Sequence, residues 1–439
     1  MKRKSLPQLE EKIKNKMARV GIVGLGYVGL PLAIAFSEAG FKVLGLDVDP
    51  ERIDLINQGK SYIADVSSER ISVGLANGFL EVTTTQSYLK EVDVICICVP
   101  TPLKKSKEPD LSYVINAAEE ISRHLQSGQL VVMESTTYPG TTKEVILPIL
   151  KRSELKAGED FYLAYSPERA DPGNKNYNIR NTPKIVAGID PESTRLVELL
   201  YRQITDMVIS VSSPEVAEMS KIFENVFRNV NIALVNELAQ LCEKMSISVW
   251  EVISTASSKP FGYMPFRPGP GIGGHCIPLD PYYLASKARE YDFHTRFIEL
   301  AAEINEQMHY YVTSRIMEAL NLRGKSLSGA KVLVLGVTYK KDVEDTRESP
   351  SLKLIQLLRE KGADVNYNDP YVPKIKMLDE TLTSVELSEE QLSSAECVVV
   401  ATDHSCYDYQ HIVNKARLVF DTRGATKGLS NDIILRLGE

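Results

Sequence analysis

The stretch Ala18-Arg19-Val20-Gly21-Ile22-Val23-Gly24-Leu25-Gly26-Tyr27-Val28-Gly29 decides the fold of the first part of this chain. Residues 18–23 are a short apolar strand, and the glycines lead directly into the helical residues 30–37. A second strand, Lys42–Leu46, follows and ends at Asp47. A Gly-x-Gly-x-x-Gly pattern alone is a weak signal, but between a strand and a helix it is typical of a dinucleotide-binding β–α–β unit.

Each residue of this turn has a physical task in such a unit. We expect Gly24 to make the tight turn, Gly26 to admit a pyrophosphate at the helix N-terminus, and Gly29 to let helix and strand pack closely. Asp47 would accept hydrogen bonds from the ribose hydroxyls and repel a 2′-phosphate, which favours NAD over NADP. A β–α–β unit without a ligand is the alternative. The predicted cofactor-binding residues of this unit are Gly24, Gly26, Tyr27, Val28, Gly29, Asp47 and Arg52, with Arg52 equally well explained as a solvated helix charge.

The alternation of strands and helices continues to about residue 212. Apolar runs at 92–99, 130–133, 161–165, 184–188 and 207–210 predict strands, and the continuous run at 92–99 is typical of a buried parallel strand. Ligands of open α/β sheets lie beyond the carboxyl ends of the strands. Polar residues at these ends therefore either border a nicotinamide or cap the turns and helices that follow. These candidates are Thr101, Ser135, Thr136 and Glu168.

Two long helices are predicted in the middle of the chain, at 214–244 and 297–322. In the first, apolar residues recur at helical spacing without a breaker. Lys221 and Asn225 are four residues apart and share one face of this helix, where they either address one ligand oxygen or belong to a solvated surface. Long helices between two domains often connect them and dimerise.

A glycine- and proline-rich loop, Arg267–Asp280, follows the first long helix. Its four glycines and three prolines exclude regular helix or strand. We interpret the glycines as positions where the backbone approaches a ligand closely. Cys276, four residues before Asp280, places a nucleophile near a base or orienting group. A turn with a buried, inert thiol is the alternative reading, and the loop alone does not decide between them.

A second α/β unit opens at Gly329–Thr338 and lacks the glycine pattern. Its first strand leads into Tyr339–Pro350, where Lys340 and Arg347 are positioned to meet phosphate. Further strands are predicted at 364–367, 397–401 and 418–420. The fold class is therefore α/β, with two Rossmann-like parallel-sheet domains joined by long central helices. We expect a lead-in at 1–17, an NAD-binding domain at 18–212, a central helical dimerisation domain with the loop at 213–325, and a second ligand-binding domain at 326–439.

The composition restricts the class of protein. The chain has 439 residues and a net charge of −7, so it lacks the basic surface that nucleic acid requires. Its six cysteines show no metal-ligand spacing beyond Cys96 and Cys98, which lie in an apolar strand, and we predict no metal site. No apolar run approaches the length of a membrane span, and no signal peptide is recognisable. We expect a cytoplasmic protein in a reducing compartment.

In combination, these motifs resemble the UDP-sugar 6-dehydrogenase family, whose members use NAD to oxidise the C6 alcohol of a UDP-hexose to a carboxylate. The resemblance runs from Val20 to Arg423. It rests on GLGYVGLPLA, STTYPGTT, SPER, EMSKIFENVFRNVNIALVNELA, GPGIGGHCIPLD, YKKDVEDTRESPS and DTRG. The segment Phe261–Phe266, with His275 and Pro278, looks most like the UDP-N-acetylglucosamine branch. DTRG departs from the commoner DTRN, which puts the role of Gly424 in doubt.

The resemblance implies a fixed set of roles. Cys276 would attack the aldehyde left by a first hydride transfer, and a second NAD would then oxidise the thiohemiacetal to a thioester that water hydrolyses. Lys221 and Asn225 would hold the oxyanion and a water, and Asp280 would orient the water. The remaining catalytic roles fall on Glu168 and Thr136. Beside the glycine turn, Thr101, Ser135, Lys287 and Arg347 are assigned to NAD or the domain interface, and Arg169, Phe266, Arg267, Gly273, Lys340 and Arg423 to the substrate.

The sequence leaves the sugar open. UDP-glucose, UDP-N-acetylgalactosamine and UDP-N-acetylmannosamine are alternatives to UDP-N-acetylglucosamine, and the product would enter polysaccharide biosynthesis. A single-step hydroxy-acid or hydroxyacyl dehydrogenase would share the first domain but needs no cysteine. An NAD-binding protein without turnover is a further alternative, against which the intact Cys276, Asp280, Lys221 and Asn225 argue. The family further implies a homodimer or higher homo-oligomer.

Overall fold

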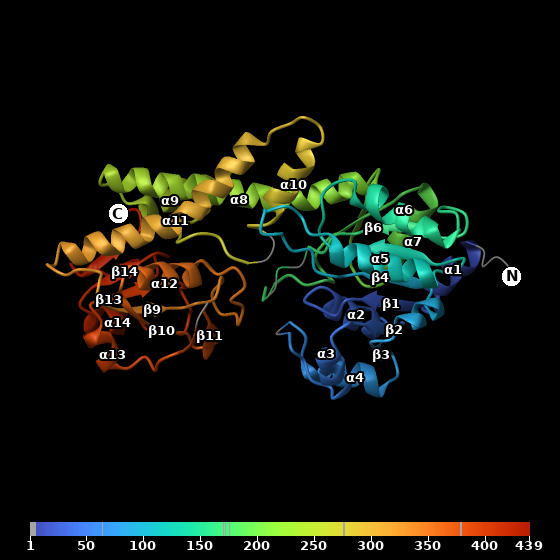
Figure 1. Ribbon diagram of the computed structural model, residues 1–439, viewed down its shortest axis with the longest axis horizontal. Helices are drawn as coiled ribbons and strands as arrows, with labels where there is room; N and C mark the ends of the chain where they lie inside the picture. Colours follow the sequence, from blue (N-terminus) through green and yellow to red (C-terminus); the bar gives the residue numbers. More distant parts are fainter. Residues whose placement is uncertain are drawn as a thin grey trace. The chain divides into compact units, whose positions relative to one another are not determined.

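The computed structural model describes residues 6–439 except 64, 170, 172, 175, 275, 276, 378 and 379. The chain forms two compact units (Figure 1). The first comprises Met1–Glu224 and Tyr282–Phe293, and the second Asn225–Pro281 and His294–Glu439. Helix α8 (Pro214–Lys244), which the uninterrupted helical pattern predicted, begins in the first unit and ends in the second. His275 and Cys276 lie outside the described residues.

The first unit is built on an eight-stranded sheet with the order β3-β2-β1-β4-β5-β6-β7-β8. From β1 the chain adds β2 and β3 on one side and then β4 on the other side, so the strand order reverses between β1 and β4. Doubly wound sheets bind dinucleotides at this point of reversal. Every pairing is parallel except β6 with β7, so the expectation of a parallel sheet is met with one exception. The strands are β1 (Arg19–Val23), β2 (Lys42–Leu46), β3 (Leu80–Thr83), β4 (Val94–Ile97), β5 (Leu130–Met133), β6 (Tyr162–Tyr165), β7 (Lys184–Gly188) and β8 (Val208–Ser210).

Helices cover both faces of this sheet, because successive residues of each strand point to opposite faces. Val94 and Cys96 belong to one apolar cluster, and Ile95 and Ile97 to the other. Both strand cysteines, Cys96 and Cys98, are buried, as expected from the apolar run. The helices are α1 (Leu6–Lys14), α2 (Gly29–Glu38), α3 (Pro50–Asn57), α4 (Ser68–Ala76), α5 (Ser112–His124), α6 (Leu147–Leu150), α7 (Pro191–Tyr201) and α10 (Asp280–Arg289), with irregular helical turns at Gln86–Glu91, Thr141–Ile146 and Lys151–Ser153.

The second unit has a five-stranded parallel sheet with the order β10-β9-β13-β14-β15. Its strands are β9 (Lys331–Leu335), β10 (Asp364–Asn368), β13 (Cys397–Val400), β14 (Val419–Asp421) and β15 (Ile434–Arg436); β11 (Lys374–Lys376) and β12 (Thr381–Thr383) form a separate hairpin. Helix α11 packs on α12 within this unit. The helices are α9 (Val249–Ala256), α11 (Arg296–Asn321), α12 (Pro350–Glu360), α13 (Glu389–Ser394) and α14 (Tyr409–Lys415).

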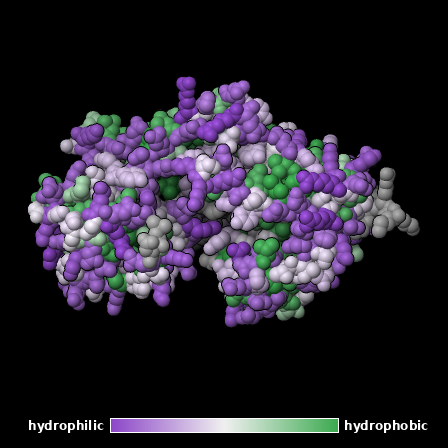
Figure 2. Space-filling model, viewed as in Figure 1, coloured by the Kyte–Doolittle hydropathy of each residue, from purple (hydrophilic) through white to green (hydrophobic). Residues whose placement is uncertain are grey.

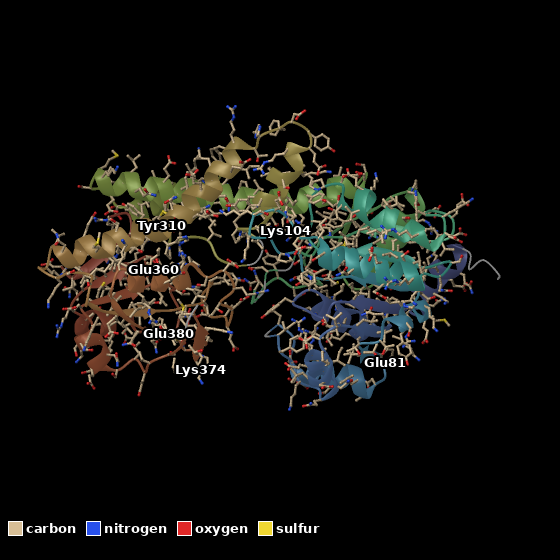
Figure 3. All side chains as sticks on the ribbon, viewed as in Figure 1. Glu81, Lys104, Tyr310, Glu360, Lys374 and Glu380 are labelled. Carbon is tan, nitrogen blue, oxygen red and sulfur yellow. The ribbon has the colours of Figure 1, made fainter. Side chains whose placement is uncertain are left out.

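Four short strands, β3, β11, β12 and β15, are missing from the sequence prediction, because each has only three or four residues and is too brief to show a strand pattern. Surface ion pairs lie at two of these short strands. Arg19 of β1 pairs with Glu81 of β3 at 2.6 Å, and Arg359 of α12 pairs with Glu380 beside β12; Glu81 and Glu380 are labelled in Figure 3.

The visible surface is largely hydrophilic, with apolar residues in scattered patches (Figure 2). Among the described residues, no helix combines the length and apolar character needed to cross a membrane. The exposed apolar residues include several on α8, among them Phe223 and Leu234, which are 63% and 65% exposed.

Candidate active site

The glycine turn after β1 has the geometry that its sequence predicts. Gly24 has a φ of +91°, and a Cβ there would lie 2.8 Å from the carbonyl oxygen of Cys98. A Cβ on Gly29 would lie 1.8 Å from the carbonyl oxygen of Gly24, so this position tolerates no side chain. Nothing lies within 4 Å of the Cβ position of Gly26. Two glycines are thus required by packing, while Gly26 leaves space in front of the first turn of α2, which suits a pyrophosphate.

Asp47, at the end of β2, is buried and closes this turn. Its Oδ2 accepts a hydrogen bond from the backbone N–H of Leu25 at 2.7 Å, and its Oδ1 accepts one from Asp49 at 3.0 Å. Arg52 lies 3.3 Å from Oδ2 and 5.8 Å from the centre of the Tyr62 ring. Arg52 is therefore tied to the carboxylate rather than free in solvent. Tyr27 is exposed, and Val28 precedes the first turn of α2.

Two predicted hydroxyls bind the loops that follow β4 and β5 to each other. Ser135 Oγ donates to the carbonyl oxygen of Val99 at 2.7 Å, and Thr101 Oγ1 donates to the carbonyl oxygen of Thr136 at 2.9 Å. Both hydroxyls therefore shape the strand ends in this structure. Thr136 itself is only half-buried.

Glu168 belongs to a buried charge cluster that sequence reasoning missed. Lys184, the first residue of β7, donates to Glu134 at 2.7 Å and to Glu168 at 3.2 Å. Tyr201 donates to the other oxygen of Glu134. Burial raises the pKa of Glu134 to about 7, although Lys184 opposes the change. Lys184 has its own pKa raised by the two carboxylates, against the effect of its burial.

Glu218 of α8 anchors the loop after β5. It accepts hydrogen bonds from the backbone N–H groups of Gly140 and Thr142 at 2.6 and 2.9 Å, and from Thr142 Oγ1 at 2.7 Å. Burial raises the pKa of this carboxyl to about 7, against these three donors. Lys221 is one turn further along α8 and is 8% exposed, which excludes the reading of a solvated surface lysine.

Asn225 and Asp280 meet in the second unit. Asn225 Nδ2 donates to Asp280 Oδ2 at 2.5 Å, and both side chains are buried. One turn further along α8, Asn229 Nδ2 donates to the carbonyl oxygen of Ile277 at 3.2 Å. The structure thus joins two of the predicted catalytic residues and binds the part of the loop that follows residues 275–276.

Three further buried asparagine contacts hold the beginning of the loop. Asn236 Oδ1 accepts from the backbone N–H of Gly269 at 3.0 Å, and Asn236 Nδ2 donates to Asn305 Oδ1 at 2.9 Å. Asn305 in turn donates to the carbonyl oxygen of Asn229 at 3.0 Å. The sequence carried a signal for these buried contacts: Asn225, Asn229 and Asn236 recur on the apolar face of one helix, where buried amides need hydrogen-bond partners.

The loop glycines pack closely against other parts of the chain. Cβ atoms at Gly269, Gly271, Gly273 and Gly274 would lie within 2.5–3.0 Å of protein atoms. Gly269 faces the side chain of Arg423, and Gly271 faces that of His309. Gly273 and Gly274 both face Tyr339, and Gly273 also faces the carbonyl oxygen of Glu348 and the ring of Pro350. Packing within the chain therefore already requires glycine at these four positions, and their approach to a ligand stays a prediction.

The remaining predicted substrate residues are dispersed over both units. Phe266 packs its ring 5.9 Å from that of Phe227, edge to face, whereas Arg267 is exposed. Arg169 pairs with Glu224 at 2.6 Å and donates to the carbonyl oxygen of Pro183. Arg423 Nε donates to the carbonyl oxygen of Ala401 at 2.8 Å, and Lys340 is half-buried in the turn after β9.

Lys287 and Arg347, predicted near NAD or a domain interface, are each engaged by carboxylates. Lys287 lies 2.5 Å from Glu144 and 2.7 Å from Glu290 within the first unit. Arg347 holds Asp345 of its own turn in the second unit at 2.6 Å. A ligand at either position would share the cation with these partners.

The departure from DTRN at Gly424 has a local cause. Gly424 has a φ of +68°, and a Cβ there would lie 2.7 Å from Cε3 of Trp250. The indole N–H of Trp250 donates to the carbonyl oxygen of Leu437 at 2.9 Å, which fixes the ring against this turn. The single tryptophan of the chain therefore requires a glycine here.

Comparison with known proteins covers most of the chain. Three models of the UDP-glucose/GDP-mannose dehydrogenase family match: the NAD binding domain over residues 18–205, the central domain over 215–307, and the UDP binding domain over 333–428. A UDP-N-acetyl-D-glucosamine 6-dehydrogenase from Pseudomonas aeruginosa is 38% identical over 81% of this chain and 84% of its own length. A UDP-N-acetyl-D-mannosamine dehydrogenase from Pyrococcus horikoshii is also 38% identical, over 88% and 89%.

Solved structures agree with this relationship. The structure of the UDP-D-ManNAc dehydrogenase from Pyrococcus horikoshii superposes with a TM-score of 0.88 at 34% identity, over 96% of this chain and 99% of that one. A UDP-glucose dehydrogenase from Pyrobaculum islandicum gives 0.84 at 26% identity, over 95% and 96%. The chain is an NAD-dependent dehydrogenase and belongs to the UDP-glucose/GDP-mannose dehydrogenase family.

Proposed function

We propose that this protein oxidises the C6 hydroxyl of a UDP-N-acetylhexosamine to the carboxylate in two hydride transfers, with Cys276 as the covalent nucleophile. The observation that carries the proposal is the buried pair Asn225–Asp280, in which Asn225 lies within α8 and Asp280 begins α10 at the end of the loop that contains Cys276. A buried carboxylate with an amide donor is suited to orient water. A one-step dehydrogenase has no need of such a pair at the end of a loop whose sequence carries a cysteine.

Bound NAD⁺ would supply the hydride acceptor in both oxidations. The first removes a hydride and a proton from C6–OH to give the aldehyde. The Cys276 thiolate then adds to the aldehyde carbon, forming a C–S bond and an oxyanion. Loss of the second hydride leaves a thioester, and attack of water releases the carboxylate and the thiol. Each turnover therefore consumes two NAD⁺ and one water.

The chain's own residues divide this work. Lys221, buried on α8, would stabilise the oxyanion, while Asn225 and Asp280 would hold and orient the attacking water. Glu168, fastened by Lys184, would take up a proton during hydrolysis. Lys340 would meet the diphosphate from the domain that matches the UDP-binding model.

UDP-N-acetylglucosamine is the substrate that we favour, on the resemblance at Phe261–Phe266. UDP-N-acetylmannosamine is the second candidate, because a relative with that name is as similar to this chain as the one named for the glucosamine. The two sugars differ only in configuration at C2, so the same C6 chemistry serves either.

The decisive experiment measures NADH formed from UDP-glucose, UDP-N-acetylglucosamine, UDP-N-acetylgalactosamine and UDP-N-acetylmannosamine. We expect two NADH per sugar with an N-acetylhexosamine, and no full oxidation by Cys276→Ser although UDP-sugar still binds. A ratio of one would refute the covalent route and support a one-step dehydrogenase. Binding of NAD without any turnover would support the non-catalytic alternative.

We further propose a cytoplasmic homodimer or higher homo-oligomer formed through α8. Its exposed apolar residues support this: Met219, Phe223, Phe227, Leu234 and Leu241 are 41–65% exposed. Light scattering of Leu234→Asp should show a smaller particle than the unaltered chain. An unchanged mass would refute this interface.

A further inference from the structure

One buried histidine fastens the turn after β9 to both neighbouring strands. His404 has no exposed surface and follows β13 in the loop beyond its carboxyl end. Its Nδ1 lies 2.9 Å from the backbone nitrogen of Asp342, in the turn after β9. Its Nε2 lies 3.0 Å from Oδ2 of Asp369, directly after β10. A single imidazole therefore joins three adjacent strand ends of the second unit, whose strands are labelled in Figure 1.

The hydrogen bonds fix the state of this imidazole. The backbone N–H of Asp342 is a donor only, so Nδ1 must accept. The ring proton is then on Nε2 and is donated to Asp369. That carboxylate also accepts from the backbone N–H groups of Val337 and Tyr371 at 2.7 and 2.8 Å. Although burial opposes the change, the hydrogen bond from His404 and these backbone donors hold the pKa of Asp369 below its ordinary value.

Asp342 needs this support because its backbone is strained. Its φ is +60°, a region that residues with a side chain seldom adopt. Besides the bond from its own N–H to His404, its carboxylate accepts from the backbone N–H of Ser405 at 2.8 Å and from Ser405 Oγ at 2.6 Å. The loops after β9 and β13 thus bind each other reciprocally at one residue.

The same loops are joined at the beginning of the turn. Thr402 Oγ1 donates to the carbonyl oxygen of Thr338 at 2.6 Å, and Thr338 Oγ1 donates to the carbonyl oxygen of Lys340 at 2.8 Å. Residues 338–342 are therefore held at both ends, with Lys340 between them. The turn lies beyond the carboxyl ends of parallel strands, where open α/β sheets bind their ligands.

We propose that His404 is a positioning residue for uridine diphosphate, which acts by fixing the turn Thr338–Asp342 and thereby the direction of Lys340. The inference rests on the proposed function, in which Lys340 meets the diphosphate. A turn ordered before the ligand arrives loses less conformational entropy on binding, so disordering it weakens affinity without touching the ligand.

Isothermal titration of the full-length protein with UDP tests this role. His404→Asn keeps an oxygen acceptor near the position of Nδ1, His404→Gln keeps a donor near Nε2, and His404→Phe keeps neither. Loss of the bond to Asp342 should weaken UDP binding about tenfold in the Gln and Phe variants, whereas the Asn variant should stay within about threefold of the unaltered protein. NAD binding should be unchanged in all three. His411→Phe is the matched control, because the His411 side chain is 45% exposed and lies 3.9 Å from Glu389 at the surface.

Asp342→Gly provides a second test that does not alter the buried core. Glycine adopts a φ of +60° without strain but removes both bonds to Ser405. We expect UDP to bind about tenfold more weakly, and urea unfolding checks that the variant is folded. UDP affinity equal to that of the unaltered protein in His404→Phe and Asp342→Gly would overturn the positioning role alone. Failure of the unaltered protein to bind UDP would overturn both proposals.

Discussion

Asn225 donates its side-chain amide to the Asp280 carboxylate at 2.5 Å, and neither side chain is more than 6% exposed. The two residues are 55 positions apart in sequence, so the contact depends on the fold of the intervening chain. It places a charged acceptor and an amide donor next to the loop that carries Cys276. The same helix face also holds Asn229 and Asn236, which makes this side of α8 a support for the whole loop.

Asp280→Asn is expected to lower kcat by at least about 100-fold. A neutral amide orients the attacking water poorly, and it has no negative charge with which to help remove a proton from that water. UDP and NAD affinities should change less than about threefold, since neither ligand is placed on this carboxylate. Stopped-flow NADH formation measures the rate, and titration measures the affinities. Asn231→Ala is the control, because Asn231 donates to the carbonyl oxygen of Phe227 in its own helix. An unchanged kcat for Asp280→Asn would refute the role of the pair.

Asp47→Ala should relax the preference for NAD over NADP by at least about tenfold in kcat/KM. The carboxylate repels a 2′-phosphate, and its removal frees Arg52, now 3.3 Å away, to pair with that phosphate. Because Asp47 also accepts from Leu25 in the glycine turn, affinity for both cofactors should fall. Asp49→Ala removes the other carboxylate near Arg52 and serves as the control. A ratio unaltered in Asp47→Ala would mean that this residue does not read the ribose.

Patterns of local origin were predicted well, and contacts between distant residues were not. The strand–glycine–helix order around Gly24 determines a local turn, so the turn geometry followed from the sequence. The Glu134–Lys184 pair joins residues 50 positions apart, and nothing in either segment marks them as partners. The asparagines of α8 carried a signal, but which loop they bind depends on how the helix is packed. The glycines at 269–274 show the same limit. Their number indicates that other atoms approach the backbone closely there, and only the fold shows that these atoms include the side chains of Arg423, His309 and Tyr339.

Glu134→Gln should change the pH dependence of stability. The folded pKa is about 7, above the ordinary value of 4.5, so the folded protein binds this proton more tightly than the unfolded chain. The resulting stabilisation is complete below about pH 4.5 and is lost as pH rises through 7. The glutamine variant does not lose this stabilisation. Its free energy of unfolding should therefore rise by about 2 kcal/mol relative to that of the unaltered protein between about pH 5 and 8.

Urea unfolding of the variant and of the unaltered protein at about pH 5 and pH 8 measures this difference. Glu218, whose pKa is also raised to about 7, is present in both proteins, so its contribution cancels. Glu159→Gln is a surface control, since Glu159 is 61% exposed and 3.6 Å from Lys156. A stability gap that does not vary with pH would show that Glu134 is ionised throughout.

Gly424→Asn, which restores the residue commoner in this motif, should destabilise the protein by about 1–3 kcal/mol. Asparagine tolerates the positive φ of this position better than most residues, so the cost comes from its Cβ, which would lie 2.7 Å from the Trp250 ring. Gly428→Asn separates the two effects, because Gly428 has a φ of +88° and nothing lies within 4 Å of its Cβ position. Its cost should be below about 1 kcal/mol. In a Trp250→Leu background, Gly424→Asn should become nearly neutral, giving a coupling energy of at least about 1 kcal/mol in the double-mutant cycle. Equal costs with and without the indole would show that backbone strain alone selects glycine at 424.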